Sequence, residues 1–358
     1  MAYALTFAMV SIFYSIFNNI IFGEGLLPSI KGLMVLVAMF PLLSNGKKLE
    51  QFLRVNFYLG FLLVALNTVV LLHFFHVMQL PFERIPRVGG GLGRPDLDPV
   101  SFNLFGRTEA FPAGRTGVPR LQGWSSEPLH WAFFVYWTLT CWVLTFPVKG
   151  VGKKYYVAAL CVIALHLYFM QSATAFIVGF VILGVAALFF LLRNRLSEKG
   201  LSWAIYFILI LVPGILTPIL IASLNGITHL IYNETVFAKA ANWTNKLDFS
   251  GIGLGIFTRF APLSDNEYSA SHDLVLGTYL KMGWLMLLPL LALLYMEIRC
   301  AVRTTSRRVF VASIIVVVEL TLGMEGIFFS PGGMMMQVAI LAACLNRVIQ
   351  RPEGQSEF

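Results

Sequence analysis

Ten long apolar segments limit the fold of this sequence more than any other feature. A helix needs about 20 mostly apolar residues to cross the hydrocarbon core of a bilayer, and continuous runs favour helical spans over alternating barrel strands. The segments are residues 3–22, 27–44, 56–79, 128–148, 155–170, 172–192, 202–223, 273–296, 308–329 and 333–349. We therefore expect an all-α fold, a polytopic transmembrane bundle of about ten spans, with residues 1–358 forming a single integral membrane domain.

The composition argues against a soluble protein. Hydrophobic residues make up 58% of the chain and charged residues only 12%, whereas about a quarter of an ordinary soluble domain is charged. In a membrane protein, the net charge of +8 indicates cytoplasmic loops rich in Lys and Arg rather than nucleic-acid binding. We expect the lipid bilayer as a partner and no nucleic acid.

The basic residues of the short loops predict the orientation. They fall on one side if both termini lie in the cytoplasm, which agrees with an even number of spans and with the positive-inside rule. These residues are Lys47, Lys48, Arg54, Lys149, Lys153, Lys154, Arg193, Arg195, Lys199, Arg299, Arg303, Arg307 and Arg308. Two long loops, residues 81–127 and 224–272, then face outward, and long loops are where chemistry concentrates.

The first external loop is rich in arginine and contains no lysine. Its arginines are Arg84, Arg87, Arg94, Arg107, Arg115 and Arg120. A guanidinium group holds phosphate in two-point contact, whereas an ammonium group is a point charge. The alternative is that these arginines pair with carboxylates of the loop or with anionic lipid. The loop ends in Arg120-Leu-Gln-Gly-Trp-Ser-Ser-Glu127-Pro128, which puts Glu127 at the mouth of the fourth span and Pro128 in its first turn.

The second external loop contains three further features. Residues 227–241 have the spacing of an amphipathic helix, which would lie on the membrane surface or pack on the bundle. A glycine-rich stretch, residues 251–255, precedes Arg259. The loop closes with His272-Asp273 at the start of the eighth span.

Two blocks of sequence, Arg120–Pro128 and the stretch from the glycines of residues 251–255 to His272-Asp273, together resemble the O-antigen ligase and polymerase superfamily. Arg120-x-x-Gly-x-x-x-Glu127-Pro128 before an apolar span is similar to bacterial O-antigen and exopolysaccharide polymerases, and His272 matches the functional histidine of the superfamily. The resemblance covers about residues 115–340. Asp273 stands where members more often have Asn, and residues 171–175 contain no arginine where members often have a Ser-Arg pair.

The resemblance implies a function. The expected activity is glycosyl transfer that polymerises undecaprenyl-diphosphate-linked oligosaccharide repeat units into O-antigen, as in lipopolysaccharide, or into exopolysaccharide. The expected place is the periplasmic face of the bacterial inner (cytoplasmic) membrane. The expected fold is that of lipid-linked-sugar glycosyltransferases, and direct displacement would invert configuration. A chain-length regulator is one candidate protein partner.

The resemblance also implies roles for particular residues. Arg120, with Arg259 as a second candidate, would bind the diphosphate, and His272 would activate or position the acceptor hydroxyl. Glu127 would orient Arg120, bind sugar or act as the base in place of His272. Because guanidinium groups stabilise the leaving diphosphate, no metal or other cofactor is expected. Further substrate contacts are assigned to Arg115, Trp124 and Glu325.

Three alternatives remain at this stage. A ligase would deliver finished chains to lipid A core, and a peptidoglycan polymerase would share the ten spans and the large loop after the seventh. A transporter or flippase would use Glu319 with Lys31 or Lys281 as a proton path, although a structural ion pair is favoured.

His73, His76 and His130 have a spacing compatible with zinc, but an interfacial belt is the favoured interpretation. The four cysteines predict no disulfide.

Overall fold

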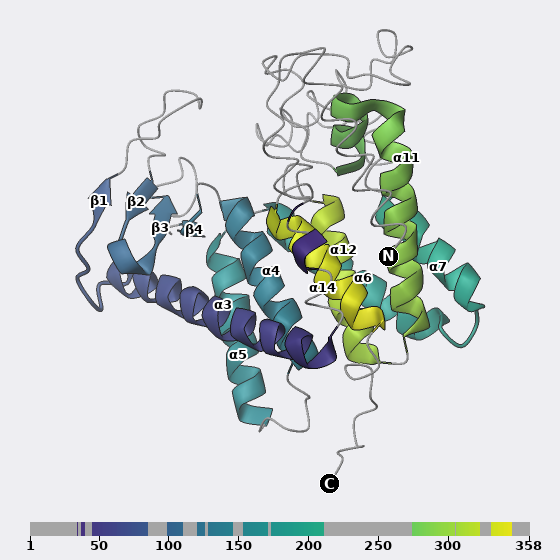
Figure 1. The fold of residues 1–358 in the computed structure, drawn as a ribbon. Helices are drawn as coiled ribbons and strands as arrows, with labels where there is room; N and C mark the ends of the chain where they lie inside the picture. The colour runs from purple at the N-terminus through teal and green to yellow at the C-terminus, as the bar shows by residue number, and fades with distance from the viewer. Residues whose placement is uncertain are drawn as a thin grey trace, which may run out of the picture. The chain divides into compact units, whose positions relative to one another are not determined.

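The fold is taken from a computed structural model of the chain, and the described residues are mostly helical (Figure 1), which agrees with the expected all-α class. The described residues are 34, 37–39, 45–84, 99–109, 120–125, 128–145, 153–170, 173–210, 274–304, 306–322 and 331–345. They divide into two compact units, whose boundary falls inside helix α6 between Leu183 and Gly184. Each unit is described separately below.

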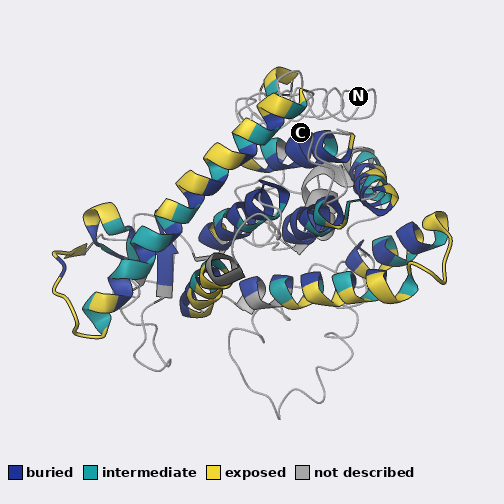
Figure 2. Ribbon diagram, turned by 90° about the horizontal axis from the view of Figure 1, so that it is seen from below, coloured by how far each residue is buried: buried dark blue, intermediate teal, exposed yellow. Residues whose placement is uncertain are grey.

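The described part of the N-terminal unit is built on three helices and the first half of a fourth. These are α3 (Gly46–Phe74), α4 (Pro128–Thr145), α5 (Lys153–Met170) and the beginning of α6 (Ala173–Leu192). One face of α3 is buried at helical spacing, through residues such as Leu49, Leu53 and Phe57, and the opposite face exposes residues such as Tyr58 and Leu62. Figure 2 shows this division of buried and exposed residues along α3.

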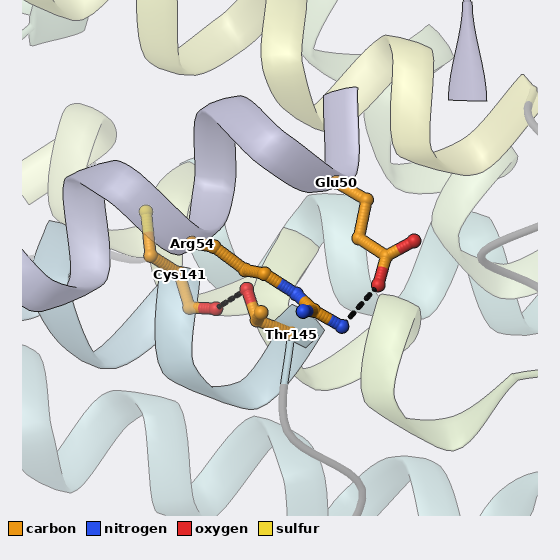
Figure 3. Close-up of polar contacts among 4 residues, drawn as sticks. All are labelled: Glu50, Arg54, Cys141 and Thr145. Carbon is orange, nitrogen blue, oxygen red and sulfur yellow. Dashed lines mark hydrogen bonds and ion pairs between the residues drawn. The ribbon is translucent and has the colours of Figure 1, made fainter. Parts of the chain in front are cut away.

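Helices α3 and α4 pack closely in antiparallel directions. Trp137 Nε1 donates to Asn56 Oδ1 over 3.2 Å, and a Cβ at Gly60 would lie 2.2 Å from Thr138 Oγ1. A side chain at position 60 would have to displace the side chain of Thr138. Phe57 of α3 stacks on Trp142 of α4 with ring centroids 6.4 Å apart, whereas Asn67, further along α3, bonds to Gly123 just before α4. The first turns of α3 therefore lie beside the last turns of α4. Figure 3 shows this end, with the Glu50–Arg54 pair of 2.6 Å on α3 and Thr145 donating to the Cys141 carbonyl of α4.

A small antiparallel sheet lies at the other end of α3, within the loop of residues 81–127. Its strands are β1 (Glu83–Arg84), β2 (Pro99–Ser101), β3 (Arg107–Glu109) and β4 (Arg120–Gly123), in the order β1-β2-β3-β4. The 3-10 helix η2 (Asn103–Phe105) joins β2 to β3. The sequence predicted only a loop here, because strands of two to four residues are too short to show an alternating pattern.

Among the described residues, the C-terminal unit contains the end of α6 and four further helices. These are α7 (Glu198–Tyr206), α11 (Leu274–Arg303), α12 (Arg307–Leu322) and α14 (Pro331–Leu345). Helix α12 is the core element, since nearly all its described side chains beyond the first turn are buried. The rings of Phe189 on α6 and Phe310 on α12 stack with centroids 3.5 Å apart.

Basic residues gather at one end of this unit. Arg303, in the last turn of α11, lies 3.6 Å from Glu198, in the first turn of α7. Arg307, in the first turn of α12, lies over the ring of Phe190 near the end of α6. The ends of α6 and α11 and the beginnings of α7 and α12 therefore meet on the same side of the unit.

Among the described residues, one helix, α3, is both long and apolar enough to cross a membrane. Shorter apolar helical stretches are Val157–Met170, Val178–Leu192 and Met335–Leu345. Predicted span 3–22, most of span 202–223 and the whole second loop, 224–272, lie outside the described residues. The count of ten spans and the single integral membrane domain stay predictions.

Candidate functional site

Strand β4, which begins the Arg120–Pro128 block, packs against three helices. It contacts α3, α4 and α5, and its residues Leu121 and Gln122 are fully buried. Arg120 is the first residue of β4 and pairs with Glu109 of β3 in the sheet register. The backbone that carries Arg120 is therefore fixed to the end of a helical bundle.

Gly123 is at the point of closest packing in this block. Its φ of +58° is a left-handed conformation that favours glycine. A Cβ at this position would also lie 2.1 Å from Cδ2 of Trp131 in the first turn of α4. The glycine of the block is thus required by both backbone conformation and space, since the indole ring lies directly against the main chain.

Asn67, on α3, ties the sheet to the helices. Its side-chain amide donates to the carbonyl oxygen of Phe105 in η2 over 2.7 Å, and its Oδ1 accepts from the backbone N–H of Gly123 over 3.2 Å. The residue is completely buried. Both hydrogen bonds hold main-chain groups, so a single buried amide positions η2 and β4 together.

A chain of hydrogen bonds links Trp131 to His166 on α5 and then to Thr68 on α3. Its indole N–H donates to Nε2 of His166 over 2.5 Å. Because an indole nitrogen is only a donor, Nε2 must be the acceptor and the imidazole proton must be on Nδ1. Nδ1 lies 2.9 Å from Oγ1 of Thr68, whose hydroxyl donates to the Val64 carbonyl over 2.8 Å. His166 is thereby held as the neutral Nδ1–H tautomer.

The rest of the block forms a tight connection to α4. The backbone N–H of Ser125 donates to the Gln122 carbonyl over 3.1 Å, and α4 begins at Pro128, as the sequence indicated. Trp124 packs edge-on against Trp131, with ring centroids 5.6 Å apart, and part of its ring is exposed. Trp124 is therefore available to a ligand beside β4.

Most of the predicted site residues lie outside the described residues. These are Arg115, Glu127, Arg259, His272 and Glu325. Their proximity to Arg120 and the assignment of a base stay predictions. Of the six loop arginines, Arg84, Arg107 and Arg120 belong to strands of the sheet.

The histidines considered for zinc have other surroundings. Nδ1 of His73 accepts from the backbone N–H of Leu80 over 3.0 Å, and its ring packs against Phe82 and Phe102. His130 is exposed. No group of three or more His, Cys, Asp or Glu side chains in the described part of the chain could hold a metal ion. His73 instead anchors the turn that follows α3.

Two carboxyl groups are buried in the part of the C-terminal unit that the structure describes. Glu319 on α12 and Glu297 on α11 are almost completely buried, and neither has a hydrogen-bond partner within the described residues. Lys31 and the side chain of Lys281, the predicted partners of Glu319, lie outside those residues. The sequence analysis missed Glu297, because it lies just beyond the predicted eighth span among arginines that suggested an exposed end.

Two further buried residues, Asn67 and His166, were also missed. The available signal was a polar side chain inside an apolar segment, which in a membrane protein marks a structural or functional site. None of the four cysteines forms a disulfide, as expected.

Comparisons of the chain with protein-family models, with curated proteins and with solved structures found no match.

Proposed function

We propose that this chain is an integral membrane glycosyltransferase that polymerises undecaprenyl-diphosphate-linked oligosaccharide repeats at the external face of the bacterial inner membrane. The observation that carries the proposal is the packing of β4 against α3, α4 and α5, which fixes the backbone of Arg120 at the end of these helices. A guanidinium group on a fixed backbone is suited to bind a lipid diphosphate that reaches the membrane surface.

Exposed apolar side chains support placement in a bilayer. Large hydrophobic residues are exposed along α3, α5 and α6, among them Leu59, Leu165 and Phe180. A soluble surface rarely carries contiguous apolar faces of this extent. In lipid, these faces would be the contact surface of the helices.

The positions of the charged residues support the orientation. Arg54 lies near the beginning of α3, and Asn67, which binds β4, lies 13 residues further along, about 20 Å by helical rise. The sheet is therefore at the opposite end of α3 from Arg54. In the C-terminal unit, Arg303 and Arg307 gather at one end. Both patterns agree with basic cytoplasmic ends and an external sheet.

The proposed reaction needs two groups from the protein: a cation that stabilises the leaving diphosphate and a base that accepts the hydroxyl proton. The anomeric carbon of the donor repeat forms a bond to the acceptor hydroxyl oxygen, the bond to the diphosphate oxygen breaks, and the hydroxyl proton passes to a base. Arg120 stabilises the negative charge on the departing diphosphate. His272 or Glu127 takes the proton. Trp124, exposed beside β4, offers a ring face to a sugar.

A lipopolysaccharide gel from cells that lack the gene tests the proposal. A polymerase deletion leaves a single repeat on lipid A core, because the ligase still acts on the monomer. A ligase deletion leaves bare core. We expect the deletion strain to show a single-repeat band and the same strain with the gene on a plasmid to show the full ladder. Bare core or an unchanged ladder in the deletion strain would contradict the proposal.

A transporter of lipid-linked sugars is the second candidate, because Glu319 and Glu297 are buried without partners among the described residues. Buried carboxyl groups of this kind occur in proton paths. A transporter would need at least one of them to exchange a proton during each cycle, whereas glycosyl transfer at β4 needs neither.

A further inference from the structure

The chain leaves α3 through a turn with exposed apolar side chains. Val77 is 71% exposed, and Phe75, Met78 and Phe82 are each about half exposed. Leu104 is 78% exposed on η2, which packs against α3. We call these five residues the α3-end cluster. Clusters of exposed hydrophobic residues usually mark a contact surface.

Five backbone N–H groups of this turn donate to acceptors within the protein. The N–H groups of residues 75–78 all donate to carbonyl oxygens of the last turns of α3, over 2.9 to 3.2 Å. The N–H of Leu80 donates to Nδ1 of His73 over 3.0 Å. The apolar side chains of the turn point outward while these five donors bond within the protein, and internal bonding of backbone groups is what a lipid environment favours.

The length of α3 places the cluster at a membrane surface. No Asp, Glu, Lys or Arg occurs in α3 after Arg54. The 20 residues from Val55 to Phe74 extend about 30 Å at 1.5 Å per residue, which is about the thickness of a hydrocarbon core. With Arg54 at one surface, the residues that follow Phe74 lie at the other. Aromatic and apolar residues concentrate at such interfaces.

The exposed face of α3 leads into the cluster. Val55, Tyr58 and Leu62 are more than half exposed, residues 65, 66 and 69 on the same face are partly exposed, and Leu72 is exposed just before the α3-end cluster. Acyl chains that contact the helix would therefore also contact the turn. This continuity favours lipid over a protein partner as the occupant.

We infer that the α3-end cluster inserts into the outer lipid leaflet, so that the sheet β1–β4 lies on the membrane surface rather than in bulk solvent. The inference rests on the proposed function for the side of the membrane on which the sheet lies. Asn67 bonds both η2 and Gly123, so the insertion also sets the height of β4. Arg120 then has its backbone near the level of lipid phosphates, where a polyprenyl diphosphate would present its charge.

Site-specific fluorescence in lipid nanodiscs tests the depth of the cluster. In a full-length chain with its four cysteines replaced by alanine, an environment-sensitive label is attached at Leu104→Cys. Leu62→Cys, exposed in the middle of α3, is the lipid control, and Lys199→Cys, exposed in the first turn of α7, is the aqueous control. The nanodiscs contain phosphatidylethanolamine and phosphatidylglycerol, with or without brominated acyl chains, and iodide is the aqueous quencher.

The expected result is bromolipid quenching at Leu104 within about twofold of that at Leu62, together with weak iodide quenching. Quenching at Leu104 like that at Lys199 would overturn the inference. Protection from both quenchers would also overturn it, since it would mean that another protein surface covers the cluster.

A second measurement avoids substitutions. A phospholipid with a photoreactive group in its acyl chain, added to the unsubstituted protein, should label the peptides that contain residues 75–82 and 104. Labelling confined to mid-span peptides would contradict the inference. Both experiments use lipid alone, so loss of polymerase activity and absence of membrane insertion are distinguishable outcomes.

Discussion

The indole ring of Trp131 occupies the space that a side chain at position 123 would need, since a Cβ on Gly123 would lie 2.1 Å from Trp131 Cδ2. This contact joins the strand that carries Arg120 to the first turn of α4. Because Trp131 is in turn hydrogen-bonded to His166 on α5, the position of β4 depends on residues far apart in the sequence.

Gly123→Ala should displace β4. The added methyl group meets the ring of Trp131, and the φ of +58° is unfavourable for alanine. We expect a loss of about 2–4 kcal/mol in stability or a shift of β4 that abolishes polymer formation. Thermal unfolding of the purified protein measures the first outcome and the polymerisation assay the second.

Gly184→Ala is the matched control for this change. Nothing lies within 4 Å of a Cβ at that position in α6, and alanine is favoured over glycine inside a helix by about 0.5–1 kcal/mol. Its melting temperature should be equal to or higher than that of the parent. Equal behaviour of the two variants would show that the Trp131 contact does not restrict position 123.

Asn67→Ala should loosen the sheet without unfolding the helices. It removes two hydrogen bonds and leaves the Gly123 N–H and the Phe105 carbonyl without their partner, at a cost of about 2–4 kcal/mol. Hydrogen exchange should accelerate in residues 103–106 and 120–123 while α12 remains protected. The control is Asn56→Ala, which removes a bond from Trp137 on the same helix pair and should leave exchange in the sheet unchanged.

His166→Ala should lower stability by about 3 kcal/mol, because it leaves a cavity and a buried indole N–H without an acceptor. His166→Gln should recover part of the loss, since a carboxamide offers an acceptor toward Trp131 and a donor toward Thr68. His130→Ala, on the exposed surface of α4, should change stability by less than about 0.5 kcal/mol. Thermal unfolding ranks the three variants, and a glutamine variant no better than alanine would argue against the tautomer assigned here.

Glu319→Gln separates the two functional candidates. The glutamine is close in size but has no carboxyl group to exchange a proton, so polymer yield should stay within about twofold of the parent if no proton moves through this residue. Glu50→Gln, in an exposed pair with Arg54, is a control for removing a carboxylate elsewhere. A folded Glu319→Gln protein that has lost its activity would favour a proton-coupled transporter.

Where the predicted apolar spans fall on described residues, most of them coincide with helices. The bounds differ where a helix has a charged or polar end. The predicted spans 155–170 and 172–192 correspond to α5 and α6. The span 56–79 differs from α3, which begins at Gly46 and ends at Phe74. Hydropathy leaves out the first turns, where Glu50 and Arg54 pair at helical spacing, and it includes a turn in which His76 has a φ of 58°.

The candidate site was predicted as a motif but not as a structure. The position of Pro128 indicated the start of α4, because proline fits a first turn. The partners that hold β4 could not be predicted, since Asn67 and Gly123 are 56 residues apart, and Thr68 and His166 are 98 apart. Such contacts depend on how α3, α4 and α5 pack, and no local spacing in the sequence encodes that arrangement.

Polymer formation by the purified protein, supplied with a defined undecaprenyl-diphosphate-linked repeat, tests the central claim most directly. The account predicts a ladder of products from the parent and from Arg54→Ala, whose arginine lies at the opposite end of α3 in an exposed pair worth less than about 1 kcal/mol. It predicts no ladder from Arg120→Ala or His272→Ala proteins that remain folded. A full ladder from folded Arg120→Ala protein would contradict the account.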